Sequence, residues 1–389
     1  MQRLAGPARF TVLLVGLAVL AACGPAPAAR PAATAPPAPQ GAPAAPSAPE
    51  AAAPPAAAGG TQPAFDERAV ADFYRGKTVR ILVGFAAGGG YDTYSRVIGR
   101  HLRKYIPGSP TVIVENMPGA GSILAANHLY NVGPRDGTLI GNISGPIALE
   151  QLFASQGVEY DMARFRYLFV PTAEAYQLVV TRKPGVTKID ELFGPNAKEV
   201  VVGGIPGSTV EHAAILMRDA VGAKIRLVSG YDGTSKVRLA IDNGEVDGFF
   251  NTWQSTKVTS REKFESGEWL VLATLADQPI KDWPNVPAIP DFARTEDQRQ
   301  ILRYGTYVPN QIGKIYAVHG DVPADRAAAL ERAFSRLMSD PEFLAEAEKA
   351  SLDFDPIYGE EIQKIMAELL AMSPDVKAKL QEVMKPQGR

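Results

Sequence analysis

Two glycine-rich stretches contain the residues whose types and spacing could bind a negatively charged group. The first, residues 84–93, reads GFAAGGGYDT and follows a short β-branched run at residues 78–83. Three consecutive glycines let neighbouring backbone N–H groups turn toward one point, and the N-terminus of a following helix favours negative charge there. This loop could therefore hold a carboxylate or a phosphate without a basic side chain. The alternative is a plain strand-to-helix turn in which Asp92 is the N-cap.

The second stretch, residues 203–211, reads GGIPGSTVE and repeats this arrangement. Ser208 and Glu211 have the spacing of a capping box, which predicts a well-capped helix. The hydroxyls of Ser208 and Thr209 could also donate hydrogen bonds to an oxyanion. Two such loops that face each other across a cleft would bind a small anion from both sides.

The remaining motifs disfavour nucleotide binding and catalysis. The first loop lacks the third glycine of G-x-G-x-x-G, because Thr93 stands there, and no lysine follows as in a P-loop. The chain contains neither G-x-S-x-G nor H-E-x-x-H, and its four histidines are scattered. Ser208 and His212 are four residues apart, but a capping serine beside a helical histidine explains this pair. We therefore expect no catalytic residue, no cofactor and no metal.

The elements that must position these loops follow from hydrophobic periodicity. Helical patterns at residues 94–105, 122–130 and 209–221 alternate with short apolar or β-branched runs. The predicted strands are residues 78–83, 111–114, 139–142, 178–181, 200–202, 225–228, 248–250, 270–274 and 315–318. This alternation indicates an α/β protein with largely parallel sheets covered by helices on both faces. Toward the C-terminus the pattern becomes helical, with apolar stripes at residues 330–338 and 362–370.

The composition excludes several classes of protein. The 389 residues are 46% hydrophobic and 21% charged, which is typical of a soluble chain of about two domains and not of a multi-pass membrane protein. A net charge of -2 gives no field that would recruit nucleic acid or an anionic membrane surface. The single cysteine, Cys23, forbids an intrachain disulfide and a cysteine-based zinc cluster.

The first 23 residues are predicted to export and anchor the chain. Arg3 and Arg9 precede an apolar run at residues 10–22, which at 13 residues is too short to span a bilayer and is typical of a signal peptide. The run ends in LAACG, which resembles the lipobox of bacterial lipoproteins, so residues 1–23 would be signal peptide and lipobox with Cys23 as the lipidation site. Gly24 stands where an aspartate often signals inner-membrane retention, which favours the outer membrane. The alternative is ordinary cleavage with an incidental cysteine.

Residues 24–64 are predicted to form a disordered tether. Of these 41 residues, 18 are alanine and 12 are proline, so no core can form and an extended polyproline conformation is favoured. Without the first 64 residues, 325 remain to carry the function, and their 37 basic and 41 acidic side chains give a net charge of -4.

Four motifs in order resemble the substrate-binding proteins of tripartite tricarboxylate transporters, the Bug family. They are VGFAAGGGYD at residues 83–92, VIVENMPGAGS at 112–122, PRDGT at 134–138 and GEVD at 244–247. The resemblance covers essentially residues 74–389. It implies a type II periplasmic-binding-protein fold, in which two α/β lobes joined by crossover segments close around a ligand cleft. It also implies that the first glycine-rich loop and the loop at residues 207–209 hold a carboxylate, largely through backbone N–H groups and ordered water.

Within this fold we predict a first lobe of residues 65–175 plus 304–389 and a second lobe of residues 176–303. Loops at residues 144–146, 231–234 and 251–253 follow predicted strands and are expected to line the cleft, whereas the turn at 118–122 is interpreted as packing. The predicted ligand-binding residues are Phe85, Ala86, Ala87, Gly88, Gly89, Gly90, Tyr91, Asp92, Ser144, Gly207, Ser208, Thr209, Tyr231, Asp247 and Asn251. Gly84 and the pair Gly90-Tyr91 depart from the commoner family pattern, which favours a different, aromatic carboxylate.

The leading hypothesis is a monomeric, lipid-anchored periplasmic receptor that captures a small carboxylate and passes it to the membrane subunits of such a transporter. Di- or tricarboxylates and aromatic carboxylates are the candidate ligands, and no nucleic acid is expected as a partner. Two alternatives stay open. One is a sensor module that reports ligand occupancy to a partner protein without a transporter. The other is a cell-envelope enzyme that acts on a carboxylate through Ser208 or Asp247.

Replacement of Cys23 tests the predicted lipid anchor. The wild-type chain should incorporate labelled palmitate and fractionate with membranes, whereas Cys23→Ala should lose both properties, because the acyl chains depend on that residue. An unlabelled wild-type protein would contradict the lipobox interpretation.

Overall fold

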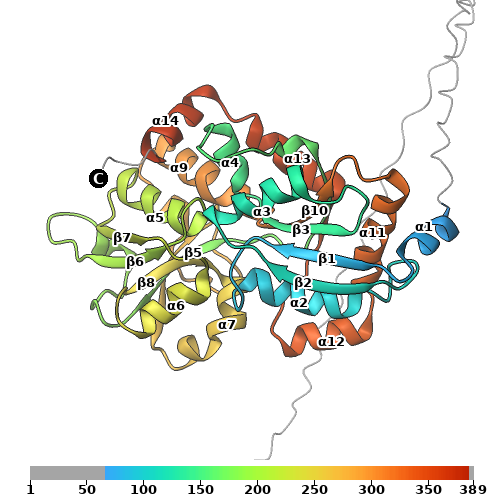
Figure 1. Cartoon of the computed structure of the whole chain (residues 1–389). Coiled ribbons are helices and arrows are strands. Elements are labelled where there is room, and N and C mark those ends of the chain that lie inside the picture. The colour runs from blue at the N-terminus through green and yellow to red at the C-terminus, as the bar shows by residue number, and fades with distance from the viewer. Residues whose placement is uncertain (1–65, 385–389) are drawn as a thin grey trace, which may run out of the picture. The chain divides into compact units, whose positions relative to one another are not determined.

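Two β-sheets organise the computed structural model of the chain, which describes residues 66–384 (Figure 1). The first sheet has the strand order β11-β4-β10-β3-β1-β2 and the second the order β7-β6-β8-β5-β9. The predicted leader, lipobox and tether lie outside the described residues. None of the helices in residues 66–384 has the length and apolar character that a membrane span requires.

The first sheet has six strands, of which four precede and two follow the strands of the second sheet in the sequence. They are β1 (Thr78–Val83), β2 (Thr111–Asn116), β3 (Leu139–Ser144), β4 (Phe165–Val170), β10 (Lys314–His319) and β11 (Ile357–Tyr358). Strands β2, β1 and β3 are parallel, whereas β10 runs antiparallel to both β3 and β4. The expectation of a largely parallel sheet therefore fails at β10. This strand lies between β4 and β3, and because the chain returns from the second sheet beside the last residue of β3, Lys314 pairs with Ser144 and β10 runs in the opposite direction.

The second sheet comes from one continuous part of the chain. Its strands are β5 (Tyr176–Thr181), β6 (Val200–Gly204), β7 (Ile225–Ser229), β8 (Gly248–Thr252) and β9 (Trp269–Leu275). Strand β6 is parallel to β7 and β8, and β5 is antiparallel to β8 and β9. Sequence analysis missed β4, whose aromatic-rich run FRYLFV is a fully formed strand, and β11, which is only two residues long.

Helices cover both faces of each sheet, as predicted for an α/β protein. They are α1 (Glu67–Tyr74), α2 (Gly90–Leu102), α3 (Ile123–Asn127), α4 (Ile147–Leu152), α5 (Thr209–Asp219), α6 (Thr234–Asp242), α7 (Trp253–Glu265), α8 (Ile289–Phe292), α9 (Glu296–Leu302), α10 (Val308–Gln311), α11 (Ala324–Leu337), α12 (Pro341–Lys349), α13 (Gly359–Leu370) and α14 (Pro374–Met384). In Figure 1, α2 and α11 lie on one side of the first sheet and α3 and α13 on the other, while α6 and α5 lie on opposite sides of the second sheet.

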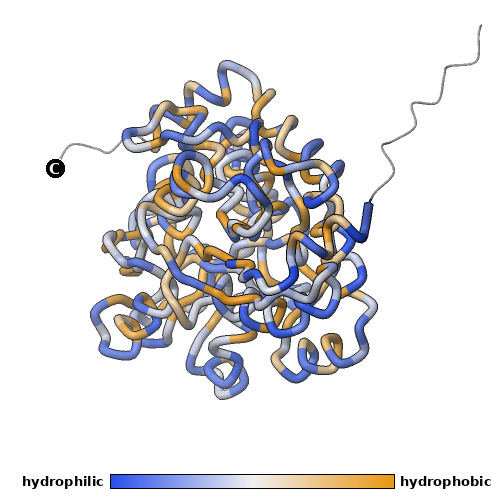
Figure 2. Tube along the Cα trace, turned by 45° about the vertical axis from the view of Figure 1, so that its right-hand side comes forward, coloured by the Kyte–Doolittle hydropathy of each residue, from blue (hydrophilic) through white to orange (hydrophobic). Residues whose placement is uncertain are grey.

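The hydrophobic core lies between these layers. The tube in Figure 2 is mostly hydrophobic along the inner strands and mixed along the outer helices. The apolar stripe predicted at residues 330–338 is a core face, since Leu330, Phe334 and Leu337 are fully buried and Phe334 stacks on Phe169 with ring centroids 4.9 Å apart. These contacts fix α11 on the strands that lead to the second sheet.

Two segments connect the sheets. Residues 171–175 lead from β4 to β5, and residues 276–313 lead from β9 back to β10. Near the end of the chain, α14 packs against α5 and α9, so the polypeptide crosses once more toward the second sheet. The lobe limits at residues 175 and 303 stay a prediction, although the strands of each sheet fall on either side of them.

Candidate functional site

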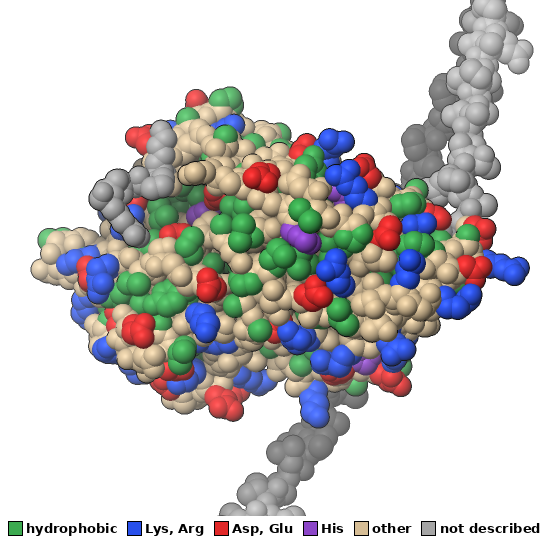
Figure 3. Space-filling model, viewed as in Figure 1, with side chains coloured by type: hydrophobic (Ala, Val, Ile, Leu, Met, Phe, Trp, Pro, Cys, Tyr) green, Lys and Arg blue, Asp and Glu red, His purple; other side chains and the backbone are tan. Residues whose placement is uncertain are grey.

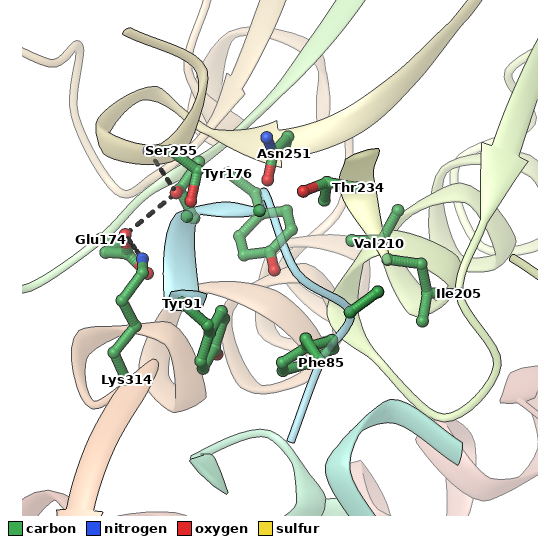
Figure 4. Close-up of a pocket in the computed structure, with 14 residues that line it drawn as sticks. Phe85, Tyr91, Glu174, Tyr176, Ile205, Val210, Thr234, Asn251, Ser255 and Lys314 are labelled. Carbon is green, nitrogen blue, oxygen red and sulfur yellow. Dashed lines mark hydrogen bonds and ion pairs between the residues drawn. The ribbon is translucent and has the colours of Figure 1, made fainter. Parts of the chain in front are cut away.

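A pocket lies between the two sheets at the point where four helices begin (Figure 4). In this conformation its free volume is about 20 Å³, which is room for about one water molecule. The lining residues are Phe85, Ala86, Gly89, Gly90, Tyr91, Glu174, Tyr176, Ile205, Val210, Thr234, Asn251, Thr252, Ser255 and Lys314. They come from the loop and start of α2 on the first sheet and from the loops and starts of α5, α6 and α7 on the second. Glu174 in the connecting segment 171–175 and the first residues of β5 and β10, Tyr176 and Lys314, complete the lining.

The four helices begin here because each directly follows a strand. Helix α2 follows β1, and α5, α6 and α7 follow β6, β7 and β8. Since the carboxyl ends of parallel strands meet at one edge of a sheet, the N-termini of the helices that follow them meet there too. The first N–H groups of a helix have no intrahelical acceptor, and its N-terminus carries about half a positive charge. The unbonded N–H groups at these helix starts could donate to an anion, whereas the N–H of Ser255 at the start of α7 already donates to the Thr252 hydroxyl at 3.2 Å.

The shape of the first glycine-rich loop is held by Asp92 from inside. Gly89 is the N-cap of α2, so the interpretation of Asp92 as the N-cap is wrong. The buried Asp92 carboxylate accepts hydrogen bonds from the N–H of Gly88 at 2.9 Å and from the side chains of Asn116 at 3.0 Å and Arg96. Burial alone would raise the pKa of Asp92, but these hydrogen bonds outweigh it and lower the pKa. Asp92 thus shapes the loop without lining the pocket.

Tyr91 forms one wall of the pocket and is fixed by its hydroxyl. The hydroxyl donates to the carbonyl of Gly313 at 2.7 Å, and the ring packs on Phe85 with centroids 4.3 Å apart. Ser144, at the end of β3, interacts with the Tyr91 hydroxyl from behind and does not line the pocket. Burial raises the pKa of Tyr91 and of Tyr176, so both phenols stay neutral.

The second loop differs from its prediction. The Ser208 hydroxyl donates to the carbonyl of Ile205 at 2.8 Å, and its oxygen caps no helical N–H. The Glu211 carboxylate accepts from the N–H of Gly207, the residue before the N-cap, so the expected capping box does not form. The Thr209 hydroxyl accepts from Asn310 at 3.2 Å. None of Gly207, Ser208 and Thr209 lines the pocket; from this helix start only Val210 does.

Two further predicted residues lie outside the pocket. The Asp247 carboxylate accepts from the N–H of Val201 at 2.9 Å and ties the start of β8 to β6. The ring of Tyr231 lies against Gly203. The predicted residues that do line the pocket are Phe85, Ala86, Gly89, Gly90, Tyr91 and Asn251.

Ala87 and Gly88 have a different role, because their carbonyls face α6 across the cleft. The Ser235 hydroxyl donates to the Ala87 carbonyl at 3.0 Å, and the Arg238 guanidinium donates to the Gly88 carbonyl at 2.8 Å. Burial lowers the pKa of Arg238. These bonds join the first-sheet loop to a second-sheet helix, so the described conformation is one in which the two lobes are in contact.

Glycines make this close contact possible. A Cβ at Gly90 would lie 1.9 Å from Oγ of Ser255 on α7, and a Cβ at Gly121 would lie 2.2 Å from the carbonyl oxygen of Gly207. The turn at residues 118–122, interpreted from sequence as packing alone, therefore also forms part of the contact between the lobes. Its residues Ala120 and Ser122 have φ angles of 45° and 93°, which non-glycine residues rarely adopt.

The main feature that sequence analysis missed is an ion pair between Glu174 and Lys314 in the pocket wall. Both side chains are 1% exposed, and Glu174 also accepts from the Thr252 hydroxyl at 3.0 Å. Burial lowers the pKa of Lys314, and the adjacent carboxylate opposes this shift. The one available signal was a lysine at the head of an otherwise apolar strand, because a lysine at such a position needs a buried partner.

No nucleophile–base pair forms at Ser208 and His212. Nε2 of His212 lies 2.9 Å from the Glu150 carboxylate on α4, and Ser208 bonds to a backbone carbonyl instead. Within residues 66–384, no three histidine, cysteine or acidic side chains are grouped so that they could hold a metal ion. On the face seen in Figure 3, acidic and basic side chains are interspersed, which agrees with the low net charge.

Comparisons with known proteins agree with this architecture. No family model matches the chain. The curated UPF0065 protein in the gbd 5' region of Cupriavidus necator is 25% identical over 241 residues, which cover 59% of this chain and 68% of that protein. Among solved structures, the periplasmic binding protein BugD has a TM-score of 0.60 and 16% sequence identity. The superposition covers 80% of this chain and 98% of BugD. Rpa4515 of R. palustris, solved with adipate, has a TM-score of 0.63 and 18% sequence identity. That superposition covers 79% of this chain and 97% of Rpa4515.

These similarities confirm the two-lobed fold of periplasmic binding proteins. They also confirm the resemblance to Bug-type solute-binding proteins that the four sequence motifs indicated.

Neutralising Asp92 should reduce stability in a pH-dependent way. Because its pKa is lower in the folded than in the unfolded chain, the charged carboxylate stabilises the fold above its ordinary pKa of 3.8, and this contribution is lost as the pH falls further. Asp92→Asn should lose about 1–3 kcal/mol of unfolding free energy at pH 7, and its unfolding free energy should decline less steeply than that of the wild type as the pH falls below about 4.

Denaturant unfolding at several pH values measures both effects, with Asp232→Asn as an exposed control. Equal pH slopes for wild type and Asp92→Asn would contradict the role given to this carboxylate.

Proposed function

We propose that the protein is an extracytoplasmic receptor that binds a small carboxylate in the pocket between its lobes and releases it to a membrane transporter. The observation that carries the proposal is the convergence of four helix N-termini, from both sheets, on one pocket. Its only acidic side chain, Glu174, is already paired with Lys314. An anion would therefore find donors from both lobes and no unpaired negative charge.

The chemistry of the donors favours a carboxylate. Helix α2 has 13 residues, α5 has 11 and α6 has 9, so each is long enough to present a positive N-terminal end, whereas α7 is kinked at Ser260, where φ is -152°. A planar carboxylate can accept two or more backbone N–H bonds with each oxygen. The low polarity of the surrounding walls strengthens these bonds. Binding of this kind requires no covalent step.

Closure of the two lobes would sequester the ligand. The contacts of Ser235 and Arg238 with the carbonyls of the first loop join the lobes only when the cleft is closed. A ligand held by donors from both lobes favours this state, and release follows when the lobes separate.

The similar proteins support the location and the class of ligand in this proposal. BugD is described as a periplasmic binding protein, and Rpa4515 was solved with adipate, a carboxylate. By analogy we place this chain in the periplasm, attached to a membrane through Cys23, as a monomer that serves the membrane subunits of a tripartite tricarboxylate-type transporter.

A ligand panel tests the proposal directly. Mono-, di- and tricarboxylates, aliphatic and aromatic, are each compared with the uncharged amide of the same skeleton in a thermal unfolding assay. At least one carboxylate at millimolar concentration should raise the unfolding temperature by about 2 °C or more, and its amide should not, because only the anion gains from the helix N-termini. If no carboxylate stabilises the protein, the proposed function is wrong.

Adding a methyl group at Gly90 tests the role of lobe closure. Gly90→Ala should weaken binding of the carboxylate found in the panel by about tenfold or more, because its Cβ would collide with Ser255 and hold the lobes apart. Gly90→Ala/Ser255→Gly should recover part of the affinity, with Ser255→Gly as the matched control. Calorimetric titration measures all three, and wild-type affinity in Gly90→Ala would reject the model of closure.

A further inference from the structure

We infer that His212 and Glu150 form a proton-dependent latch between the two lobes, so that closure, and with it the affinity for a carboxylate, strengthens when the His212 imidazole takes up a proton. This inference rests on the proposed function and adds a means of regulating the same site. The latch acts without touching the bound carboxylate, because neither residue lines the pocket.

The two side chains belong to elements of different lobes. Glu150 lies on α4, which follows β3 of the first sheet and packs against α13 (Figure 1). His212 lies on α5, which packs against β6, β7 and β8 of the second sheet. Nε2 of His212 is 2.9 Å from the Glu150 carboxylate, and the two side chains are 5% and 11% exposed. The contact is therefore shielded from water and depends on the lobes being together.

Among the four histidines, only His212 pairs with an ionisable group of the other lobe. His101 and His319 pair with carboxylates of the first lobe, to which they themselves belong, and His128 also lies in that lobe. Histidine is the side chain that ordinarily changes its charge between pH 5 and pH 8. A change in the strength of closure over this range therefore falls on His212.

The surroundings of the imidazole favour positive charge. A crevice with a free volume of about 440 Å³ reaches the pair, and its lining includes Glu150 from α4 and Glu211 from α5 but no lysine or arginine. The other side chains that line it are uncharged: Phe153, Ser155, Gln156, Ile215, Gln381 and Met384. Nδ1 of His212 forms no hydrogen bond within residues 66–384, so a proton added there breaks no existing bond.

The carboxylate partner is charged in this contact. Burial raises the pKa of Glu150, but the interactions with His212 and Ser155 outweigh burial and lower the pKa. The positive end of α5 opposes a cation nearby, and the Glu211 carboxylate offsets this effect by accepting from the N–H of Gly207. A charged imidazole therefore gains more from Glu150 than a neutral one does.

The direction of the pH effect follows by linkage. The charged imidazole gains this energy only when the lobes meet, so closure takes up a proton. Because the proton and the carboxylate both favour the closed state, each strengthens the binding of the other. The affinity for a carboxylate should therefore rise as the pH falls from 8 to 6, a range in which ordinary carboxylic acids stay ionised.

Calorimetric titration at pH 8, 7 and 6 tests the latch in the full chain, with the carboxylate that gives the largest thermal shift in the earlier panel as the probe. The affinity of the wild type should rise by about threefold or more between pH 8 and pH 6. His212→Gln should bind with an affinity that does not change with pH, because its amide nitrogen can replace Nε2 as a donor to Glu150 but takes up no proton. His128→Gln is the matched control and should keep the pH dependence of the wild type.

A second variant removes the charge of the partner. Glu150→Gln keeps an oxygen that accepts from Nε2 but has no negative charge, so it should also lose the pH dependence. His212→Gln/Glu150→Gln should show no further loss, because the effect belongs to the pair. Circular dichroism establishes that each variant is folded, and if one single variant does not fold, the other carries the test.

The outcomes separate the latch from the proposed function. If the affinity of the wild type stays constant or falls from pH 8 to pH 6, the latch is overturned and the carboxylate receptor stands. The wild-type pH dependence in a folded His212→Gln or Glu150→Gln variant overturns the latch as well. If no carboxylate of the panel binds at any of the three pH values, the proposed function fails and the latch falls with it.

Discussion

The ion pair between Glu174 and Lys314 joins the two places where the chain passes between its sheets. Glu174 lies in the segment from β4 to β5, and Lys314 begins β10 directly after the segment from β9. The N–H of Glu174 also donates to the carbonyl of Asn310, whose side chain bonds to Thr209 at the start of α5. Two connecting segments and one pocket helix are thus held by a single buried network. Since an unpaired charge at such a depth is very costly, the network forms as a whole or not at all.

Around this ion pair, backbone groups and side chains have different roles in the pocket. Backbone N–H groups at helix starts provide the donors, and Asp92 shapes the loop that presents them from a position outside the pocket. Glycines at positions 90 and 121 allow the lobes to approach to distances that any side chain would prevent. In the turn around Gly121, the non-glycine residues Ala120 and Ser122 have positive φ angles. Such a backbone conformation costs about 1–3 kcal/mol of folding free energy per residue unless other contacts offset it. One compensating contact is the hydrogen bond from the N–H of Ser144 to the Ser122 hydroxyl.

Local patterns could be predicted from the sequence, and contacts between distant segments could not. The glycine run before α2 indicated both the loop and its anion-binding geometry, because loop, cap and helix are neighbours in the chain. The pairing of Glu174 with Lys314 spans 140 residues, and neither residue belongs to a motif. The role of Ser208 was misjudged for a related reason. Its spacing to Glu211 fits a capping box, in which its oxygen would accept from the N–H of Glu211, but this N–H donates to the Ser208 carbonyl and the Ser208 hydroxyl donates to the carbonyl of Ile205. The antiparallel entry of β5 and β10 depends on the crossing points, which periodicity within one element does not encode.

On the proposed function, the electrostatics of the pocket link ligand binding to closure. When the lobes meet, the positive end of α2 approaches those of α5, α6 and α7, and like partial charges disfavour this approach when the pocket holds no anion. A carboxylate between them converts the repulsion into attraction from both sides. A ligand shifts a conformational equilibrium only through its difference in affinity for the two states. In the open state the carboxylate would contact one lobe, and in the closed state both, so the arrangement of helix N-termini itself provides that difference. The neutral Glu174–Lys314 pair leaves this balance to the ligand, because it adds no net charge to either state.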